Sequence, residues 1–180
     1  MANLCDYNCA TLPEHEQISC GQFRKGGLSA AAFVDCDANI TDWSDETEWN
    51  AAIDAGKVRI IAPIRGSIPE PTPVEGENPN GCGSATILDT FDRTVEIKDY
   101  NVNANNIDFY NQLNRTKKQV VLFAGCDGQD EITVIDSSVT FVAREVLPEN
   151  NREKRMFMIT GKWTEYDMPM IYTAPAGIFN

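Results

Sequence analysis

The sequence predicts an α+β, mainly β fold: an antiparallel β-sandwich or barrel with one or two flanking helices. Short runs that are either apolar or alternate between apolar and polar residues recur from residue 28 to 163, as expected for strands. Only two segments, near residues 45–55 and 105–114, combine a capping residue with apolar positions on one helical face. At 180 residues the chain can bury one core without covalent staples, which favours a single domain.

The order of these patterns divides the chain into three parts. Residues 1–27 carry no periodicity and are expected to form an extended arm. Residues 28–163 form the mainly β domain, which contains an inserted loop at residues 66–83, and residues 164–180 form a C-terminal docking tail. The domain begins with a strand within 28–36, entered through the flexible pair Gly26-Gly27.

The first helix follows this strand. Asp42 or Ser44 can cap its N-terminus, and Gly56 can end it. Trp49, Ala52 and Ile53 then share its inward face. Trp43 and Trp49 could stack on a ligand, but aromatic residues that flank a short helix are more often part of the core. A strand over residues 57–64 comes next and is expected to end near its proline.

The loop at residues 66–83 is rich in proline and glycine and shows almost no periodicity, so we expect no regular structure there. Such a loop is either a linker or a segment that becomes ordered on a neighbouring molecule, and its prolines stiffen it for the second role. Its candidates for subunit contacts are Pro69, Pro71, Pro73 and Val74. The strand that follows, within residues 86–102, directs Val95 and Ile97 inward.

The stretch from residue 103 to 163 reads as a complete folding unit. Asn105 is expected to cap the second helix, whose apolar side carries Phe109, Tyr110 and Leu113. The apolar run at residues 119–124 is short enough for a strand that is buried on both faces. Three further strands are expected at residues 131–135, 139–146 and 155–163.

The tail at residues 164–180 is apolar and interrupted by prolines. Solvated chain ends are normally polar, so we expect this tail to be covered by its own body or by another subunit. Its candidates for subunit contacts are Met168, Met170, Ile171, Tyr172, Ile178 and Phe179.

The net charge of −12 is concentrated in the N-terminal half, where residues 1–90 carry 14 acidic and 5 basic residues. A surface this negative repels phosphates, so specific nucleic-acid binding is not expected, although DNA could pass such a surface without sticking. The start of the chain lacks the features of a signal peptide, and no apolar run is long enough to span a bilayer. We therefore expect a protein made in the cytoplasm, with no membrane partner.

Few residues offer chemistry. Cys5, Cys9, Cys20 and His15, with Cys36 as an alternative ligand, could hold zinc, but their spacing lacks a second paired knuckle, and burial of small apolar side chains is favoured over a metal site. The single histidine lies in the unpatterned arm, and the sequence contains no P-loop, zinc-protease or nucleophile-elbow motif. We expect no catalytic residues and no cofactor.

The order of elements resembles virion structural proteins of tailed bacteriophages, with tail-tube-like subunits the closest members. The resemblance rests on the run Phe91–Lys98, the helix Asn105–Asn114 and the antiparallel strands after it, and it covers most of residues 20–179. It implies a subunit that assembles in the host cytoplasm into the virion, with copies of itself and other virion proteins as partners. An auxiliary protein of the phage head would use long arms in the same way. A soluble ligand- or metal-binding module is the alternative from another class.

Overall fold

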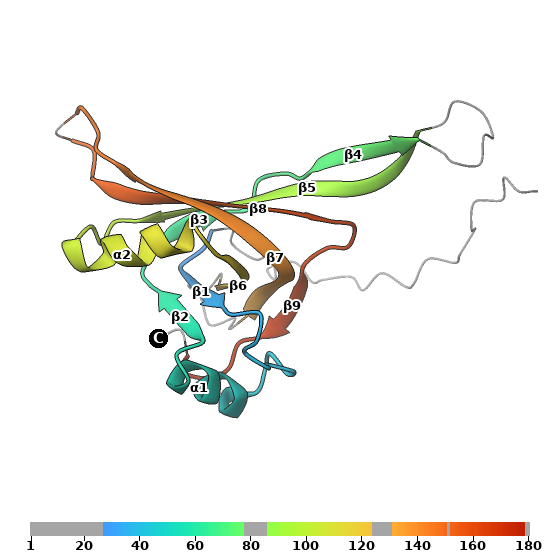
Figure 1. Ribbon diagram of the computed structural model, residues 1–180, viewed down its shortest axis with the longest axis horizontal. Helices are drawn as coiled ribbons and strands as arrows, with labels where there is room; N and C mark the ends of the chain where they lie inside the picture. Colours follow the sequence, from blue (N-terminus) through green and yellow to red (C-terminus); the bar gives the residue numbers. More distant parts are fainter. Residues whose placement is uncertain (1–26, 78–85, 124–130, 151, 179–180) are drawn as a thin grey trace, which may run out of the picture.

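The computed structural model describes residues 27–77, 86–123, 131–150 and 152–178. Within these residues nine strands form one antiparallel sheet, and two helices accompany it (Figure 1), so the prediction of an α+β, mainly β fold is confirmed. The helices are α1 (Glu46–Asp54) and α2 (Ala104–Leu113). The strands are β1 (Ala30–Val34), β2 (Val58–Ile61), β3 (Arg65–Ser67), β4 (Thr72–Glu77), β5 (Thr86–Asp99), β6 (Lys117–Phe123), β7 (Glu131–Val146), β8 (Met156–Glu165) and β9 (Met170–Thr173).

The sheet follows the path β2-β1-β6-β7-β8-β5-β3, with β4 added to β5 and β9 added to β7. The path is open, because β2 and β3 at its ends do not pair with each other. β6 lies along one edge of β7, while β8 and then β9 share the other edge. The three longest strands, β7, β8 and β5, are neighbours in this path (Figure 1). Strands β6 and β9 pair with β7, and β3 and β4 pair with β5.

The main core lies between two parts of this one sheet. Side chains of β1 and β6 pack there against the inward side chains of β5 and β8, and α2 closes the same core from its side. The apolar faces of the strands thus meet as they would in a sandwich, although the sheet is continuous. Its aromatic members are Phe33, Tyr110, Phe141, Phe157 and Trp163, and Ile97, Leu122 and Ile159 are among its fully buried aliphatic members.

A second core covers the opposite side of β1 and β6. Trp43, Trp49 and Ala52 come from α1 and the segment before it, and they pack near Val34 and Val121. The central strand β6 is therefore buried on both faces, as its apolar run predicts: its residues at 120, 121 and 122 are all fully buried.

Helix α1 begins one residue later than its predicted start. Asp45 is the N-cap, and its carboxylate accepts a hydrogen bond of 2.7 Å from the backbone N–H of Thr47. The two predicted caps lie in the preceding turn, where the carboxylate of Asp42 accepts from the N–H of Ser44. Gly56 ends the helix at a φ of 75°, a left-handed conformation that suits glycine. Trp43 and Trp49 meet edge to face at 5.9 Å, so the core role of this pair is confirmed.

Helix α2 is capped by Asn103 rather than by Asn105, because the side-chain oxygen of Asn103 accepts from the N–H of Asn106 at 3.1 Å. Its predicted inward residues Tyr110 and Leu113 are buried, and Phe109 is half-buried against the main core. The hydroxyl of Tyr110 donates to the carboxylate of Asp99, which ties the helix to the end of β5.

Two expectations about regular structure are wrong. The segment 66–83 is not wholly irregular, since β4 pairs with β5 from Thr72 to Glu77. Its proline at position 73 is accommodated because β4 is an edge strand, where a missing N–H costs little. The two strands expected at 131–135 and 139–146 are one continuous strand, β7, whose irregular pairing with β6 absorbs the polar residues between them.

The described part of the tail docks partly on its own body. β9 pairs with the first residues of β7, and Ala174 is buried. Tyr172 and Ile178 pack against the second core. The expectation that this apolar tail is covered is thus met for these residues, while other apolar residues of the tail stay exposed.

Candidate functional site

The most distinctive surface feature is a two-stranded projection, here called the ribbon, made of residues 72–77 and 86–90. Phe91 is the first residue of β5 that pairs with β8, so the residues before it pair only with β4. The ribbon therefore extends beyond the body of the molecule (Figure 1). An isolated pair of strands is marginally stable in water, because neither face is supported by a further layer.

The predicted contact residues of the proline-rich segment lie on or just before the ribbon. Pro69 and Pro73 are exposed, and Pro71 and Val74 are half-exposed. The structure therefore leaves these four residues accessible at one end of the molecule.

A second surface, here called the tail patch, consists of the exposed apolar residues Tyr166, Met168, Met170 and Ile171. Met168 is 84% exposed, and the other three are 57–65% exposed. Nine large hydrophobic side chains are exposed in the described residues, and four of them fall within the six positions 166–171. Such a concentration is typical of surfaces that contact other molecules. Of the other predicted tail contacts, Tyr172 and Ile178 are engaged by the second core, and Phe179 lies outside the described residues.

A hollow of about 580 Å³, here called the root hollow, lies where the ribbon leaves the sheet. Thr94, Lys162 and Thr140 form one cross-strand row within it. Asp92 accepts a hydrogen bond of 3.0 Å from the hydroxyl of Thr164. The lining residues are Thr72, Asp92, Arg93, Thr94, Ser138, Thr140, Lys162, Trp163 and Thr164. The side chains of the two cross-strand rows in the hollow thus supply hydroxyl groups, one lysine and one carboxylate.

Arg93 lies on β5 between these two rows, and its side chain points to the opposite, inward face of the sheet, as does that of its cross-strand partner Trp163. Arg93 is only 8% exposed, and its Nε has no hydrogen-bond acceptor within the described part of the chain. Its guanidinium lies 5.3 Å from the centre of the Phe91 ring. The neighbouring carboxylate of Glu165 is engaged elsewhere, because it accepts a hydrogen bond of 3.2 Å from Nε1 of Trp163. Arg93 is therefore a buried cation without an anionic partner among the described residues.

The sequence analysis did not identify Arg93, although a signal was present. Residues 93, 95 and 97 alternate with the period of a strand, so the inward direction of Val95 and Ile97 also directs Arg93 inward.

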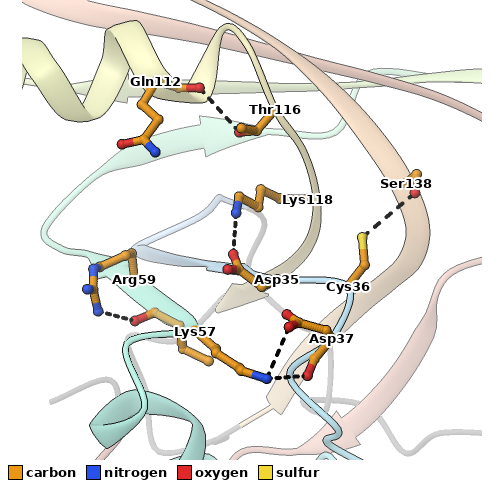
Figure 2. Close-up of polar contacts among 10 residues, drawn as sticks. Asp35, Cys36, Asp37, Lys57, Arg59, Gln112, Thr116, Lys118 and Ser138 are labelled. Atoms are coloured by element: carbon orange, nitrogen blue, oxygen red, sulfur yellow. Dashed lines mark hydrogen bonds and ion pairs between the residues drawn. The ribbon is translucent and has the colours of Figure 1, made fainter.

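A smaller cavity of about 200 Å³ lies between α2 and the strands β1, β2 and β6. Figure 2 shows that its polar wall is largely self-satisfied: Lys118 pairs with Asp35, and the hydroxyl of Thr116 donates to the backbone carbonyl of Gln112. The guanidinium of Arg59 donates to the carbonyl of Val58 at 3.1 Å. The opposite wall is apolar, with Phe33, Phe109 and Leu113.

The strongest concentration of negative charge is residues 35–54, here called the acidic lobe, which contain seven carboxylates and no lysine or arginine. Some of these carboxylates accept hydrogen bonds from groups within the acidic lobe. Glu48 accepts from the N–H groups of Asp42 and Thr41 and from the Thr41 hydroxyl, which lowers the pKa of its carboxyl group. Glu46 and Asp54 are exposed on α1 and have no cationic partner in the described residues.

The predicted zinc candidates Cys5, Cys9, Cys20 and His15 lie outside the described residues. Cys36, the alternative ligand, is exposed, and its Sγ lies 3.9 Å from the hydroxyl oxygen of Ser138. Within the described residues no three His, Cys, Asp or Glu side chains are grouped so that they could ligate a metal. In the same part of the chain, neither helix has the length and apolar composition needed to cross a membrane.

Comparison of the chain with protein-family models, with curated proteins and with solved structures finds no match.

Proposed function

We propose that the chain is a non-enzymatic structural subunit of a bacteriophage particle, which assembles with copies of itself as a tail-tube-like or ring subunit. The resemblance in element order supports the phage context. The observation that carries the self-assembly is the ribbon, because it extends away from the core with only two strands.

Among the described residues, the two strands of the ribbon pair only with each other. Ordering each residue of a strand costs about 1–2 kcal/mol of conformational entropy, and a two-stranded ribbon buries little apolar surface to offset it. A neighbouring copy that packs on the ribbon supplies the missing layer. One surface that contacts a different surface on the next copy generates a ring when the rotation closes.

The tail patch supports the same proposal independently. Its four apolar side chains are far more exposed than the core, and two of them lie on β9, which is held firmly by its pairing with β7. A rigid, exposed apolar surface favours association, since burial of apolar area stabilises by about 25 cal/mol per Å². Association of copies through this patch removes it from water.

The test compares two sets of variants. Met168→Ser, Met170→Ser and Ile171→Ser together should prevent assembly, while the unfolding free energy of the single chain changes by no more than about 0.5 kcal/mol per site, because exposed positions contribute little to folding. The matched control is Leu147→Ser with Ile107→Ser, two exposed apolar positions outside the patch.

The readout is negative-stain electron microscopy of the full chain at high concentration, with the unfolding free energy of each variant measured in parallel. The proposal expects rings or tubes for the parent chain and the control variant, and single particles for the patch variant. Identical single particles for all three would contradict it.

A further inference from the structure

We propose that the cavity between α2 and the strands β1, β2 and β6 binds a small ligand with one negative charge, a carboxylate attached to an aromatic ring. The cavity lies within one chain, so the site does not depend on self-assembly and adds a ligand to the structural role proposed above. The observation that carries the site is Arg59, the one cation of the cavity wall without a carboxylate partner in the described residues.

Strand pairing directs the polar and the apolar side chains of the wall into one space. Arg59 lies opposite Phe33 where the edge strand β2 pairs with β1, and both side chains line the cavity. Asp35 follows Phe33 by two residues and lies on the same face of the chain. From the other side, α2 contributes the ring of Phe109 and the amide of Gln112. The cavity is therefore polar at the strand side and apolar where the rings meet.

Two of the three charged side chains in the wall neutralise each other, because Lys118 pairs with Asp35 (Figure 2). The next carboxylate along the chain, that of Asp37, lies 3.1 Å from Nζ of Lys57. Arg59 donates one hydrogen bond of 3.1 Å to a backbone carbonyl, and its guanidinium has no ion pair in the described part of the chain. The wall thus carries one uncompensated positive charge, which favours a ligand with one negative charge.

Gln112 offers a second donor for the anion. Figure 2 shows its side-chain amide extending from α2 towards the strands that carry Arg59 and Lys118. Among the described residues only the backbone carbonyl of Gln112 is engaged, by the hydroxyl of Thr116, and its side-chain amide has no partner. A carboxylate in the cavity can therefore accept hydrogen bonds from the planar guanidinium of Arg59 and from the amide of Gln112.

The apolar wall selects the other part of the ligand. Phe33 and Phe109 meet edge to face with ring centres 5.7 Å apart, and Leu113 completes this wall. Aromatic rings favour such edge and offset contacts, so a further ring suits the wall better than a flexible alkyl chain. An apolar cavity of about 150 Å³ holds benzene, so the volume of about 200 Å³ has room for a ring with one carboxylate. Benzoate is the simplest probe that carries both parts.

The experiment titrates three probes into the full chain and measures their dissociation constants by saturation-transfer NMR, which works for single chains and for larger particles. Benzoate carries the ring and the charge, benzamide carries the ring alone, and acetate carries the charge alone. The variants are Arg59→Gln and Gln112→Ala, which each remove one donor. The matched controls are Arg152→Gln, outside the wall, and Asn111→Ala, the neighbouring position on α2. All four positions are exposed, and circular dichroism checks that each variant is folded.

Benzoate should bind the parent chain with a dissociation constant of about 1 mM or below, and benzamide and acetate should bind about 10-fold more weakly or worse, since each lacks one half of the contacts. Arg59→Gln should weaken benzoate binding by about 10-fold or more, the effect of losing a hydrogen bond to a charged group, and should leave the weak binding of benzamide unchanged. Gln112→Ala should weaken benzoate binding by about 2–10-fold, and both control variants should bind it like the parent.

Absence of saturable benzoate binding up to about 20 mM would overturn the inference. Equal binding of benzamide would show that the charge is not recognised, and equal binding of acetate would show that the ring is not. Parent-like affinity of Arg59→Gln for benzoate would place the ligand outside this cavity. None of these results bears on self-assembly, which electron microscopy of the ligand-free chain tests separately.

Discussion

Replacing Arg93 by methionine should make the isolated chain more stable, which is the opposite of the usual result for a buried residue. The change removes a buried donor that has no acceptor among the described residues, and such a group costs about 1–3 kcal/mol. It also loses the contact between the guanidinium and the Phe91 ring, worth about 0.5–1 kcal/mol. The methionine side chain fills similar space and adapts to irregular gaps, so little packing is lost.

The difference leaves a net gain of about 0.5–2 kcal/mol, because the penalty that is relieved exceeds the contact that is lost. For a chain of this length the gain raises the melting temperature by about 1–8 °C. Urea unfolding, at concentrations where the chain is monomeric, measures it as a higher midpoint with an unchanged slope. Arg59→Met is the control, since Arg59 is exposed, and it should change stability by less than about 0.5 kcal/mol. A loss of 2 kcal/mol or more for Arg93→Met would show that the guanidinium has an acceptor and would refute the reasoning.

The remaining predictions concern the core. Tyr110→Phe should destabilise the chain by about 1.5–3 kcal/mol, since it removes a buried hydrogen bond to the Asp99 carboxylate, and urea unfolding measures the loss. Burial and the bond to Asp99 raise the pKa of Tyr110 above its unfolded value near 10. Stability should therefore be retained below about pH 10 and fall above it as the unfolded phenol ionises, and Tyr110→Phe should lack this part of the decline. Gly161→Ala should cost about 1–3 kcal/mol, because its Cβ would lie 2.7–2.9 Å from side-chain atoms of Val95, Phe141 and Val139; an unchanged melting temperature would contradict this packing.

The sequence predicted those elements whose signals are local. The glycine at 56 marks the end of α1 correctly, and the uninterrupted apolar run in β6 indicates its burial between two cores. The predicted caps differ from the observed ones by one to three residues. Clusters of Asp, Ser and Asn offer several capping side chains, and only the tertiary position of the helix selects among Asp42, Asp45, Asn103 and Asn105.

The errors arise where pairing between distant strands decides the structure. Prolines at 69, 71 and 73 suppress every local strand signal, yet β4 forms because β5 extends beyond β8 and offers a free edge. Two separate strands were predicted at 131–135 and 139–146, but β7 is continuous because β6 pairs along one edge while β9 and β8 pair with its first and last residues on the other.

The candidate site was predicted in part. The exposed residues of the tail and the proline-rich segment were identified because their apolar character is visible without a fold. The root hollow was not, since its lining comes from four strands that the sequence does not place side by side. That the Nε of Arg93 has no acceptor among the described residues likewise depends on the pairing of β5 with β8, which places Trp163 beside it and directs Glu165 to the indole N–H.

The most direct measurement is sedimentation velocity of the full-length chain over a wide range of concentrations. If the chain covers its ribbon and tail patch with copies of itself, species much larger than 20.0 kDa should form as the concentration rises. A single species of 20.0 kDa across the whole range would contradict the account.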